Sequence, residues 1–430
     1  MSHHHVSFKD LPEGGEKFEV AKASKLVGML GGIGAVGLLG SIYFAFIAGG
    51  DSSAAFAFSW LFAVFVCFTM AAGGCFWILL HNASNSGWGV VVRRLFENLG
   101  LMVVFLFIFA APLLFPGVQT HLWEWMNHHR AAGSFEGLEE AVKHNPHLHT
   151  LAEKYGYLNI PFWYIRFFLY FIILGFMAWK LRSEFLVQEK DGSMKHTIRA
   201  RQWSCVLLFP FALTITFAAV DWVMGLDYNW FSTMWGVYIF AGSAWSSMAL
   251  MLLIVSYLRS IGYLKQVVSE EHYHLMGKLL FTFTVFWAYI AFSQYFLIWY
   301  ANIPEETRWY LVRNTDNWRW VSIGIVVGHF VAPFVLLLSQ PKKKDVRVIC
   351  GIATWVLIMH IVDIWWNIIP ERGPAVGTGV TVPGAWIGDV FAFCAVFGSL
   401  GFLYFRVMLK GNSLYAWRDP RLMESINVRN

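Results

Sequence analysis

Long apolar runs separated by short polar connections dominate the sequence. Each run has about 20 residues, the length that an α-helix needs to cross a hydrocarbon core of roughly 30 Å. Ten such runs occur, at residues 25–48, 54–80, 97–117, 161–181, 203–223, 231–258, 277–301, 317–339, 347–369 and 384–408. The pattern predicts an all-α polytopic membrane protein with ten transmembrane helices.

The connections between the runs predict a single membrane domain. Only residues 118–160 form a long connection, which is polar and rich in His and Glu, so we expect a small extramembrane element there. The other loops are short. We therefore predict an N-terminal segment at 1–24, a membrane domain at 25–410 and a C-terminal tail at 411–430. The first segment lacks the apolar core of a cleavable signal peptide.

The composition supports a membrane location and excludes several classes of protein. The chain is 57% hydrophobic and only 14% charged, against about 25% charged in an average globular protein. So few charges could not cover a water-soluble fold of this size. The five cysteines form no C-x-x-C or C-x-x-C-H pattern, which argues against a disulfide framework, covalent haem and a thiolate iron–sulfur site. No Walker motif, dinucleotide fingerprint or HExxH motif occurs.

The positive charges are unevenly distributed between the two sides of the predicted helices. With the N-terminus inside, 24 of the 32 Lys and Arg residues fall on the inner side and seven on the outer side. The remaining one, Arg166, lies within the fourth run. Because cytoplasmic loops carry the excess of basic residues, we predict that both termini are cytoplasmic. The net charge of +5 is then an orientation signal and indicates no nucleic-acid partner.

A weak internal repeat relates runs 2–5 to runs 6–9. Run 3 opens with ENLG at 97–100 and run 7 with HLMG at 274–277, while runs 5 and 9 end with VDW at 220–222 and VDIWW at 362–366. A displacement by four helices preserves the direction across the membrane. We therefore predict two parallel four-helix bundles with a flanking helix at each end. Many secondary transporters use inverted repeats instead, so the parallel repeat argues against the interpretation that the chain is an ion-coupled transporter.

Few ionisable side chains lie inside the predicted helices, where such groups are costly unless they are paired or hydrated. The proton-relay candidates among them are His329, His360, Asp363, Asp389 and Asp221, with Glu97 and Lys278 at the inner edge. Arg166 completes the set. Four of these groups, Arg166, Asp221, Asp363 and Asp389, fall in the outer third of the membrane. Mixed charge at one depth suggests mutual pairing or a polar cavity that opens outward.

The two intramembrane histidines leave three interpretations open. His360 and Asp363 are three residues apart and share a helix face, and a carboxylate beside an imidazole could relay a proton. The polar groups could instead satisfy one another without titrating. His329 and His360 differ in predicted depth by only about 5 Å, so ligation of a haem by both is a third interpretation.

The predicted external loop is rich in histidine, with His121, His128, His129, His144, His147 and His149 among several glutamates. Their spacing matches no specific metal site, and no metal is predicted. We interpret the loop as a solvated surface for partner docking. A series of glycines at 31–40 in the first run is interpreted as a close helix-packing face.

Three long strings resemble a known family. They are YGYLNIPFWYIRFFLY at 155–170, VDWVMGLDYNWFSTMWG at 220–236 and FWAYIAFSQYFLIWYANIP at 286–304. They resemble the NrfD-like integral membrane proteins, in particular the ActF-type subunits of bacterial alternative complex III. The likeness covers about residues 20 to 410 and includes the plan of ten helices in two bundles.

The resemblance implies a multi-pass subunit of a quinol:cytochrome c oxidoreductase in the bacterial inner membrane, with no bound redox centre of its own. The implied partners are a multihaem cytochrome c subunit, an iron–sulfur subunit, an ActC-like sister subunit, small membrane subunits and a terminal oxidase. The substrate would be menaquinol or another quinol. In this family the quinol site lies near the outer face of the first bundle, mainly in the sister subunit. It maps here onto Arg166 and Asp221, with Trp163 and Tyr164 beside them. A structural scaffold is the competing function.

Overall fold

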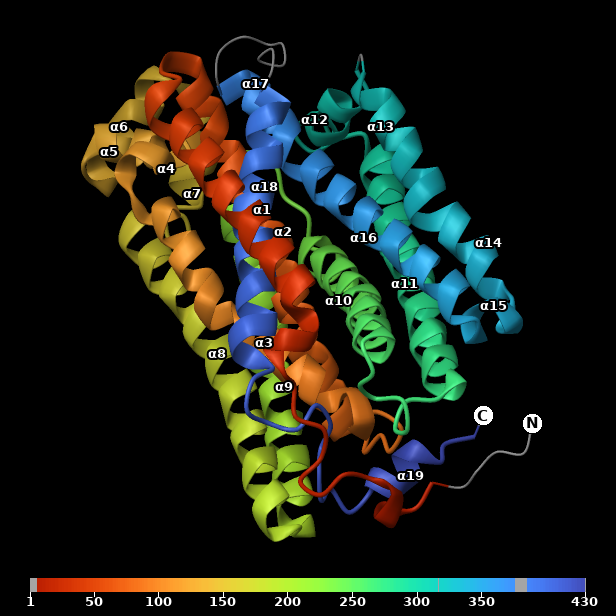
Figure 1. Cartoon of the computed structure of the whole chain (residues 1–430). Helices are drawn as coiled ribbons and strands as arrows, with labels where there is room; N and C mark the ends of the chain where they lie inside the picture. The colour runs from red at the N-terminus through yellow and green to blue at the C-terminus, as the bar shows by residue number, and fades with distance from the viewer. Residues whose placement is uncertain (1–5, 316, 376–384, 430) are drawn as a thin grey trace.

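The computed structural model describes residues 6–315, 317–375 and 385–429 and is built almost entirely of helices (Figure 1). Within these residues, ten helices are long and apolar enough to cross a membrane. They are Val20–Ile47, Asp51–Ala83, Val90–Leu114, Ile160–Asp191, Met194–Leu226, Trp235–Ser260, Glu270–Ala301, Trp318–Leu338, Val346–Glu371 and Ala385–Met408. Each overlaps one predicted run, so the predicted all-α, ten-helix membrane fold is confirmed. Residues 1–5, 316, 376–384 and 430 of the predicted segments lie outside the described residues.

The main helices follow the chain in a simple order. They are α1 (Ser24–Ile42), α2 (Gly50–Ala83), α3 (Val90–Ala110), α8 (Ile160–Asp191), α9 (Met194–Trp222), α10 (Trp235–Ser260), α11 (Glu270–Ala301), α13 (Trp318–Ile325), α14 (Ala332–Leu338), α16 (Val346–Ile368) and α18 (Ala385–Leu403). Shorter helices are α4 (Pro116–Leu122), α5 (Glu124–Ala132), α6 (Phe135–His144), α7 (His149–Glu153), α12 (Pro304–Arg313), α15 (Gln340–Lys344), α17 (Arg372–Ala375) and α19 (Leu422–Ile426).

The long helices pack as two groups of four. In the first bundle α2 packs against α3 and α9, and α8 packs against the same two helices. In the second bundle α10 packs against α11 and α16, and the α13–α14 segment packs against these two. Helices α2 and α9 of the first bundle contact α10 of the second, and α1 and α18 form a pair against α2. That the two bundles are parallel repeats of one another stays a prediction.

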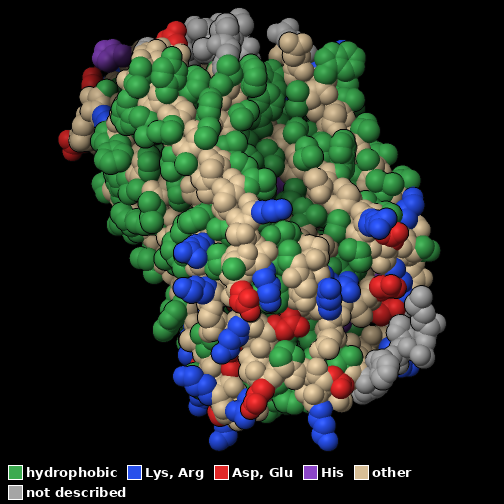
Figure 2. Space-filling view, in the orientation of Figure 1, with side chains coloured by type: hydrophobic (Ala, Val, Ile, Leu, Met, Phe, Trp, Pro, Cys, Tyr) green, Lys and Arg blue, Asp and Glu red, His purple; other side chains and the backbone are tan. Residues whose placement is uncertain are grey.

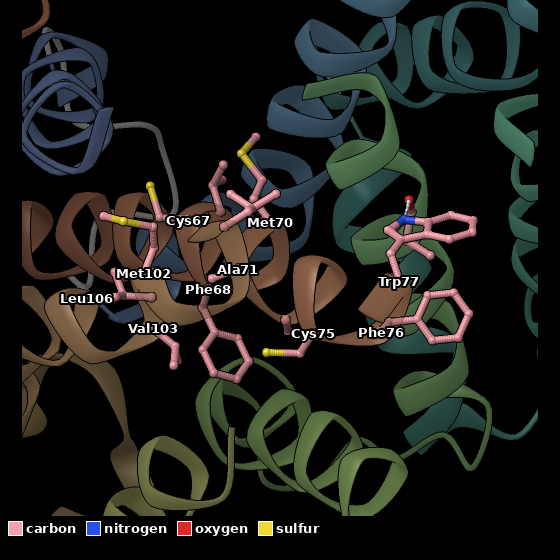
Figure 3. Close-up of a cluster of buried hydrophobic side chains, with 14 of the residues drawn as sticks. Cys67, Phe68, Met70, Ala71, Cys75, Phe76, Trp77, Met102, Val103 and Leu106 are labelled. Carbon is pink, nitrogen blue, oxygen red and sulfur yellow. Dashed lines mark hydrogen bonds between the residues drawn. The ribbon is translucent and has the colours of Figure 1, made fainter. Parts of the chain in front are cut away.

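Helix α2 forms the centre of the molecule because it is apolar on every side. Such a helix is stable only when it is surrounded by other elements. Its residues Phe68, Ala72, Trp77 and Leu79 are inaccessible to solvent, and Figure 3 shows α2 side chains extending in several directions into the core. Close helix approach depends on Gly73, where a Cβ atom would lie 2.1 Å from the backbone oxygen of Ser243 on α10. Small residues at helix contacts are typical of membrane proteins.

The pair formed by α1 and α18 has the same kind of close contact. A Cβ atom at Gly37 would lie 2.2 Å from the backbone nitrogen of Ala395, and one at Gly34 would lie 2.8 Å from Ser399. These glycines of α1 therefore face α18. Gly32 has no neighbour within 4 Å of a Cβ position, so the predicted packing face covers only part of the glycine series.

The N-terminal segment and the C-terminal tail contact each other at one end of the molecule. Both termini lie at the lower end in Figure 1, and helices α4–α7 and α12 lie at the upper end. At the lower end the N-terminal segment pairs with the tail, since Leu414 donates its backbone N–H to the Glu16 carbonyl at 2.8 Å. The Glu16 carboxylate accepts from the Leu264 amide at 2.6 Å, and burial raises its pKa.

Helices α8 and α9 extend beyond their predicted runs at the lower end. Their 32 and 29 residues correspond to about 48 and 44 Å, more than the hydrocarbon core of roughly 30 Å. The predicted runs stop near residues 181 and 203, because the hydropathy pattern ends where the first charged residues occur. The backbone stays helical there because charged side chains pair along the helix, as Lys180 and Glu184 do at 2.7 Å.

Candidate functional site

The second bundle contains a compact group of polar side chains at its centre. His329, His360 and Asp363 are fully buried, and each offers a ligand atom within 4.8 Å of the other two. We call these three residues the His–Asp cluster. Helix α16 supplies His360 and Asp363, and the segment between α13 and α14 supplies His329.

The local sequence explains how His329 enters the cluster. It lies in a π-helix, η7 (Val326–Val331), between α13 and α14. Pro333 has no backbone N–H, so the α-helical hydrogen bond to the His329 carbonyl is absent, and single π-turns are common at functional sites. The imidazole stacks between Trp245 and Trp287, with ring centroids 4.0 and 3.7 Å away. Neither ring nitrogen has a hydrogen-bond partner.

His360 is held by a contact with the first bundle. Its Nε2 lies 2.8 Å from the Thr69 hydroxyl of α2, and that hydroxyl donates to the Val66 carbonyl at 2.7 Å. Because the hydroxyl proton is used on Val66, we infer that Nε2–H donates to Thr69. Nδ1 is then an acceptor, and it has no partner. Gly242 faces it, where a Cβ atom would lie 3.3 Å from Nδ1.

Asp363 has polar neighbours without a permanent positive charge. Tyr238 donates its hydroxyl to Oδ1, and the Asn367 amide reaches the same oxygen at 3.3 Å. Oδ2 lies 3.9 Å from His329 Nε2. Within the described residues, this histidine is the only basic group in an ion-pair contact with Asp363. A buried carboxylate is costly without a charged partner, so this group favours sharing a proton with its neighbours.

The cluster has donor atoms of the kinds that bind transition metals, but it is wider than a closed metal site. Ligands at 2.0–2.1 Å from a tetrahedral ion lie roughly 3.4 Å apart. The corresponding atoms here are separated by up to 4.8 Å, and Thr69 already occupies one nitrogen of His360. We therefore interpret the group as a hydrogen-bonding cluster. The absence of a metal stays a prediction.

The first bundle contains a different polar centre, the ion pair of Arg166 and Asp221. The guanidinium donates to both carboxylate oxygens, at 2.7 and 2.8 Å, and its third nitrogen donates to the Tyr157 carbonyl at 2.9 Å. The Tyr170 hydroxyl donates to the same carboxylate. The guanidinium also stacks on Tyr157 at 3.9 Å. Charges at a common depth suggested either mutual pairing or a polar cavity that opens outward. Arg166 and Asp221 pair with each other.

The other candidates for quinol contact lie beside this ion pair. Trp163 is fully buried against Trp123, with ring centroids 4.9 Å apart, and its indole N–H has no partner. Tyr164 donates its hydroxyl to the Leu114 carbonyl at 2.9 Å. These aromatic side chains close the upper end of the first bundle.

The remaining predicted relay residues lie outside the His–Asp cluster. Asp389 of α18 forms an ion pair with Arg372 at 2.8 Å and also accepts from Ser59 and Trp365. Arg372 lies between the last two predicted runs, 347–369 and 384–408, so the hydropathy pattern does not predict this pairing.

Two candidates lie near the lower end. Glu97 forms buried ion pairs with Arg94 at 2.7 Å and with Arg93 at 3.5 Å. Lys278 is partly exposed near the start of α11. The structure therefore brings together only His329, His360 and Asp363 among the relay candidates.

Sequence reasoning missed several members of the polar centre. Thr69, Tyr238 and Asn367 complete its hydrogen bonds, but a search for ionisable groups passes over such residues. Asn367 had a usable signal, because it follows Asp363 by four residues on one helix. The contacts of Thr69 and Tyr238 come from other helices and carry no such signal.

Comparison with known proteins leaves the site to be interpreted from its own chemistry. No protein-family model matches the chain, and no curated protein sequence matches it.

Proposed function

We propose that this chain is an ActF-type integral subunit of a quinol:cytochrome c oxidoreductase, and that its His–Asp cluster conducts protons. The observation that carries the proposal is a fully buried cluster with three unpartnered imidazole nitrogens beside a carboxylate that no Lys or Arg among the described residues neutralises. Leaving a buried polar group unsatisfied costs about 1–3 kcal/mol, so such groups call for a functional explanation. The strings that resemble the family support the choice of complex.

The chemistry of quinol oxidation requires proton acceptors. A quinol that becomes a quinone gives up two electrons and two protons. The electrons would be accepted by haem and iron–sulfur centres of the proposed partner subunits, and the protons need groups that bind them at low dielectric. Imidazole is suited to this task because one ring nitrogen can accept a proton while the other releases one.

The proposed order of proton transfer is based on the positions of the polar groups. The chain of groups runs from Thr69 through His360 and His329 to Asp363 and Tyr238, across three helices and the η7 segment. Proton transfer across the gaps of up to 4.8 Å requires a bridging water in this proposal. A proton that arrives at His360 Nδ1 or at His329 forms an imidazolium, which the Asp363 carboxylate stabilises. Tyr238 and Asn367 hold that carboxylate in place.

The proposed orientation places the lower end of Figure 1 in the cytoplasm of a bacterium and the upper end outside the inner membrane. Helices α4–α7 then face the periplasm, where the multihaem and iron–sulfur subunits bind. We call helices α4–α7 the cap. Its surface carries exposed Glu–His contacts, such as Glu140 with His144 at 3.7 Å. The ActC-like sister, the small membrane subunits and a terminal oxidase would bind within or beside the membrane region.

Quinol contact at Arg166, Asp221, Trp163 and Tyr164 belongs to the same proposal. Asp221 and the Tyr157 carbonyl already accept from Arg166, so a quinol would reach the pair only after a hydrogen bond opens. We therefore place quinol oxidation mainly in the sister subunit.

A structural scaffold is the second candidate function, and one observation favours it. Several buried charges elsewhere are paired, for example Arg313 with Glu371 at 3.0 Å and Arg372 with Asp389 at 2.8 Å. A scaffold requires only such stable pairs and leaves the unpartnered nitrogens of the His–Asp cluster unexplained.

Purification of the full chain from its native membrane in a mild detergent tests the assignment. The proposal expects co-purification of haem and iron–sulfur proteins and quinol-dependent reduction of cytochrome c. A haem Soret band in the chain separated from its partners would indicate haem ligation by His329 and His360 instead. A homo-oligomer without redox partners would contradict the proposal and favour a transporter.

A further inference from the structure

An apolar groove of about 270 Å³ lies between α1, α2, α3, α10 and α18. Cys67 and Met70 of α2, Met102 of α3, Leu250 of α10 and Phe405 line it. In Figure 3 Cys67, Met70 and Met102 extend to one side of α2, whereas Phe68 and Cys75 extend to the other. The lining exposes almost no polar atom. The proposed proton path does not use this groove.

The groove continues to the lower end of the membrane helices. Leu26, in the first turn of α1, and Tyr257, in the last turn of α10, line it. Phe405 lies in the π-helix η9 (Tyr404–Met408) that ends α18, and its ring centroid is 5.7 Å from that of Tyr257. The groove therefore extends from the hydrocarbon region to the lower membrane boundary.

Positive charge gathers at this end of the groove. Lys25 precedes Leu26 in the chain, Arg406 follows Phe405, and Lys410 lies beyond it, and all three cations are exposed. No ion pair joins them to an acidic side chain within the part of the chain that the structure describes. Figure 2 shows Lys and Arg side chains over the lower part of the molecule and hydrophobic ones over the upper part.

We propose that the groove binds one acyl chain of an anionic glycerophospholipid, whose phosphate is held by Lys25 and Arg406. An apolar lining at membrane depth loses dispersion contacts unless an apolar group fills the space. A single hydrocarbon chain fits, and the cations select a lipid with a negative headgroup.

Native mass spectrometry of the purified complex in nanodiscs tests the headgroup preference. The discs contain phosphatidylglycerol and phosphatidylcholine in equal amounts. We expect the wild type to retain phosphatidylglycerol at least fivefold over phosphatidylcholine after the disc is stripped. The Lys25→Gln/Arg406→Gln variant should lose this preference. The matched control Lys342→Gln/Arg347→Gln removes two exposed cations from another inner segment and should keep it.

A second variant tests the groove itself. Leu250 lines the groove and is half-buried, so Leu250→Trp should fill the space and remove the retained lipid of both kinds. The control Val206→Trp, at a position 65% exposed on α9, should retain it. Equal retention of the two lipids by the wild type would overturn the proposal. Unchanged lipid retention in Leu250→Trp would also overturn it. So would a small protein that co-purifies with the wild type and with Val206→Trp but not with Leu250→Trp.

Discussion

Each of the two bundles contains a buried aspartate, and the two aspartates have different basic partners. Asp221 lies near the end of α9 and Asp363 near the end of α16, and each accepts a hydrogen bond from a tyrosine, Tyr170 or Tyr238. The difference is the basic partner. In the first bundle it is the guanidinium of Arg166, and in the second it is the imidazole of His329.

This difference separates a fixed centre from one that can exchange protons. Arginine stays protonated in proteins, so its pair with Asp221 keeps one charge state and one geometry. Histidine can accept a proton on one ring nitrogen and release a proton from the other. The unpartnered nitrogens of His329 and His360 leave positions at which a proton can be taken up. The comparison therefore favours a structural role for the first centre and supports the proposal that the second conducts protons.

The largest expected effect is the loss of the fixed pair. Arg166→Met leaves Asp221 buried without its guanidinium, and breaking a buried ion pair costs about 3–5 kcal/mol of unfolding free energy. The double variant Arg166→Met/Asp221→Leu should recover most of this loss, because it removes both charges. Unfolding of the purified protein in detergent, followed by tryptophan fluorescence, measures both. Unchanged stability in the single variant would argue against a structural pair.

The next effect is on activity in the second bundle. His329→Phe keeps the stacking between Trp245 and Trp287 but removes both ring nitrogens. Loss of a positioned proton-transfer group lowers a rate by about 100-fold or more. We expect quinol turnover of the complex to fall by that order while its subunit composition stays the same. Full turnover in this variant would favour the scaffold function.

A smaller effect is expected at the tyrosine of the second centre. Tyr238→Phe removes the hydroxyl that donates to Asp363 but keeps the ring stacked on Trp235 at 5.4 Å. Asn367 still donates to the carboxylate. Turnover should fall by less than in His329→Phe, and the unfolding free energy by about 1 kcal/mol. A loss of turnover as large as that of His329→Phe would make Tyr238 an obligatory carrier.

The smallest expected effect lies in the cap at the upper end, outside both centres. Burial and the neighbouring His128 lower the pKa of His129 in α5. The unfolded chain, with a His pKa of about 6.5, then binds this proton more readily than the folded cap. Stability of the cap should fall as the pH drops through that value. Hydrogen exchange of α4–α7 at pH 7.5 and 5.5 measures the change, and His129→Gln should reduce it.

Hydropathy and charge distribution predicted the ten helices because each membrane crossing leaves a local pattern of about 20 residues. The ends of α8 and α9 were missed because helical structure continues into charged residues. The sequence also predicted that His329 and His360 lie at similar depths, but it did not show that the two helices bring them together. It could not predict Thr69, Tyr238 or the partner of Asp389, because these contacts depend on how different helices pack.

The most direct test of the central claim measures the rate of proton release during quinol oxidation by the complex in sealed vesicles. Asp363→Asn keeps the shape of the side chain and removes its charge, and Tyr170→Phe is the matched change in the first bundle. The account predicts at least a tenfold slower proton release in Asp363→Asn and a rate within about twofold of wild type in Tyr170→Phe. Equal rates in wild type and Asp363→Asn would contradict it.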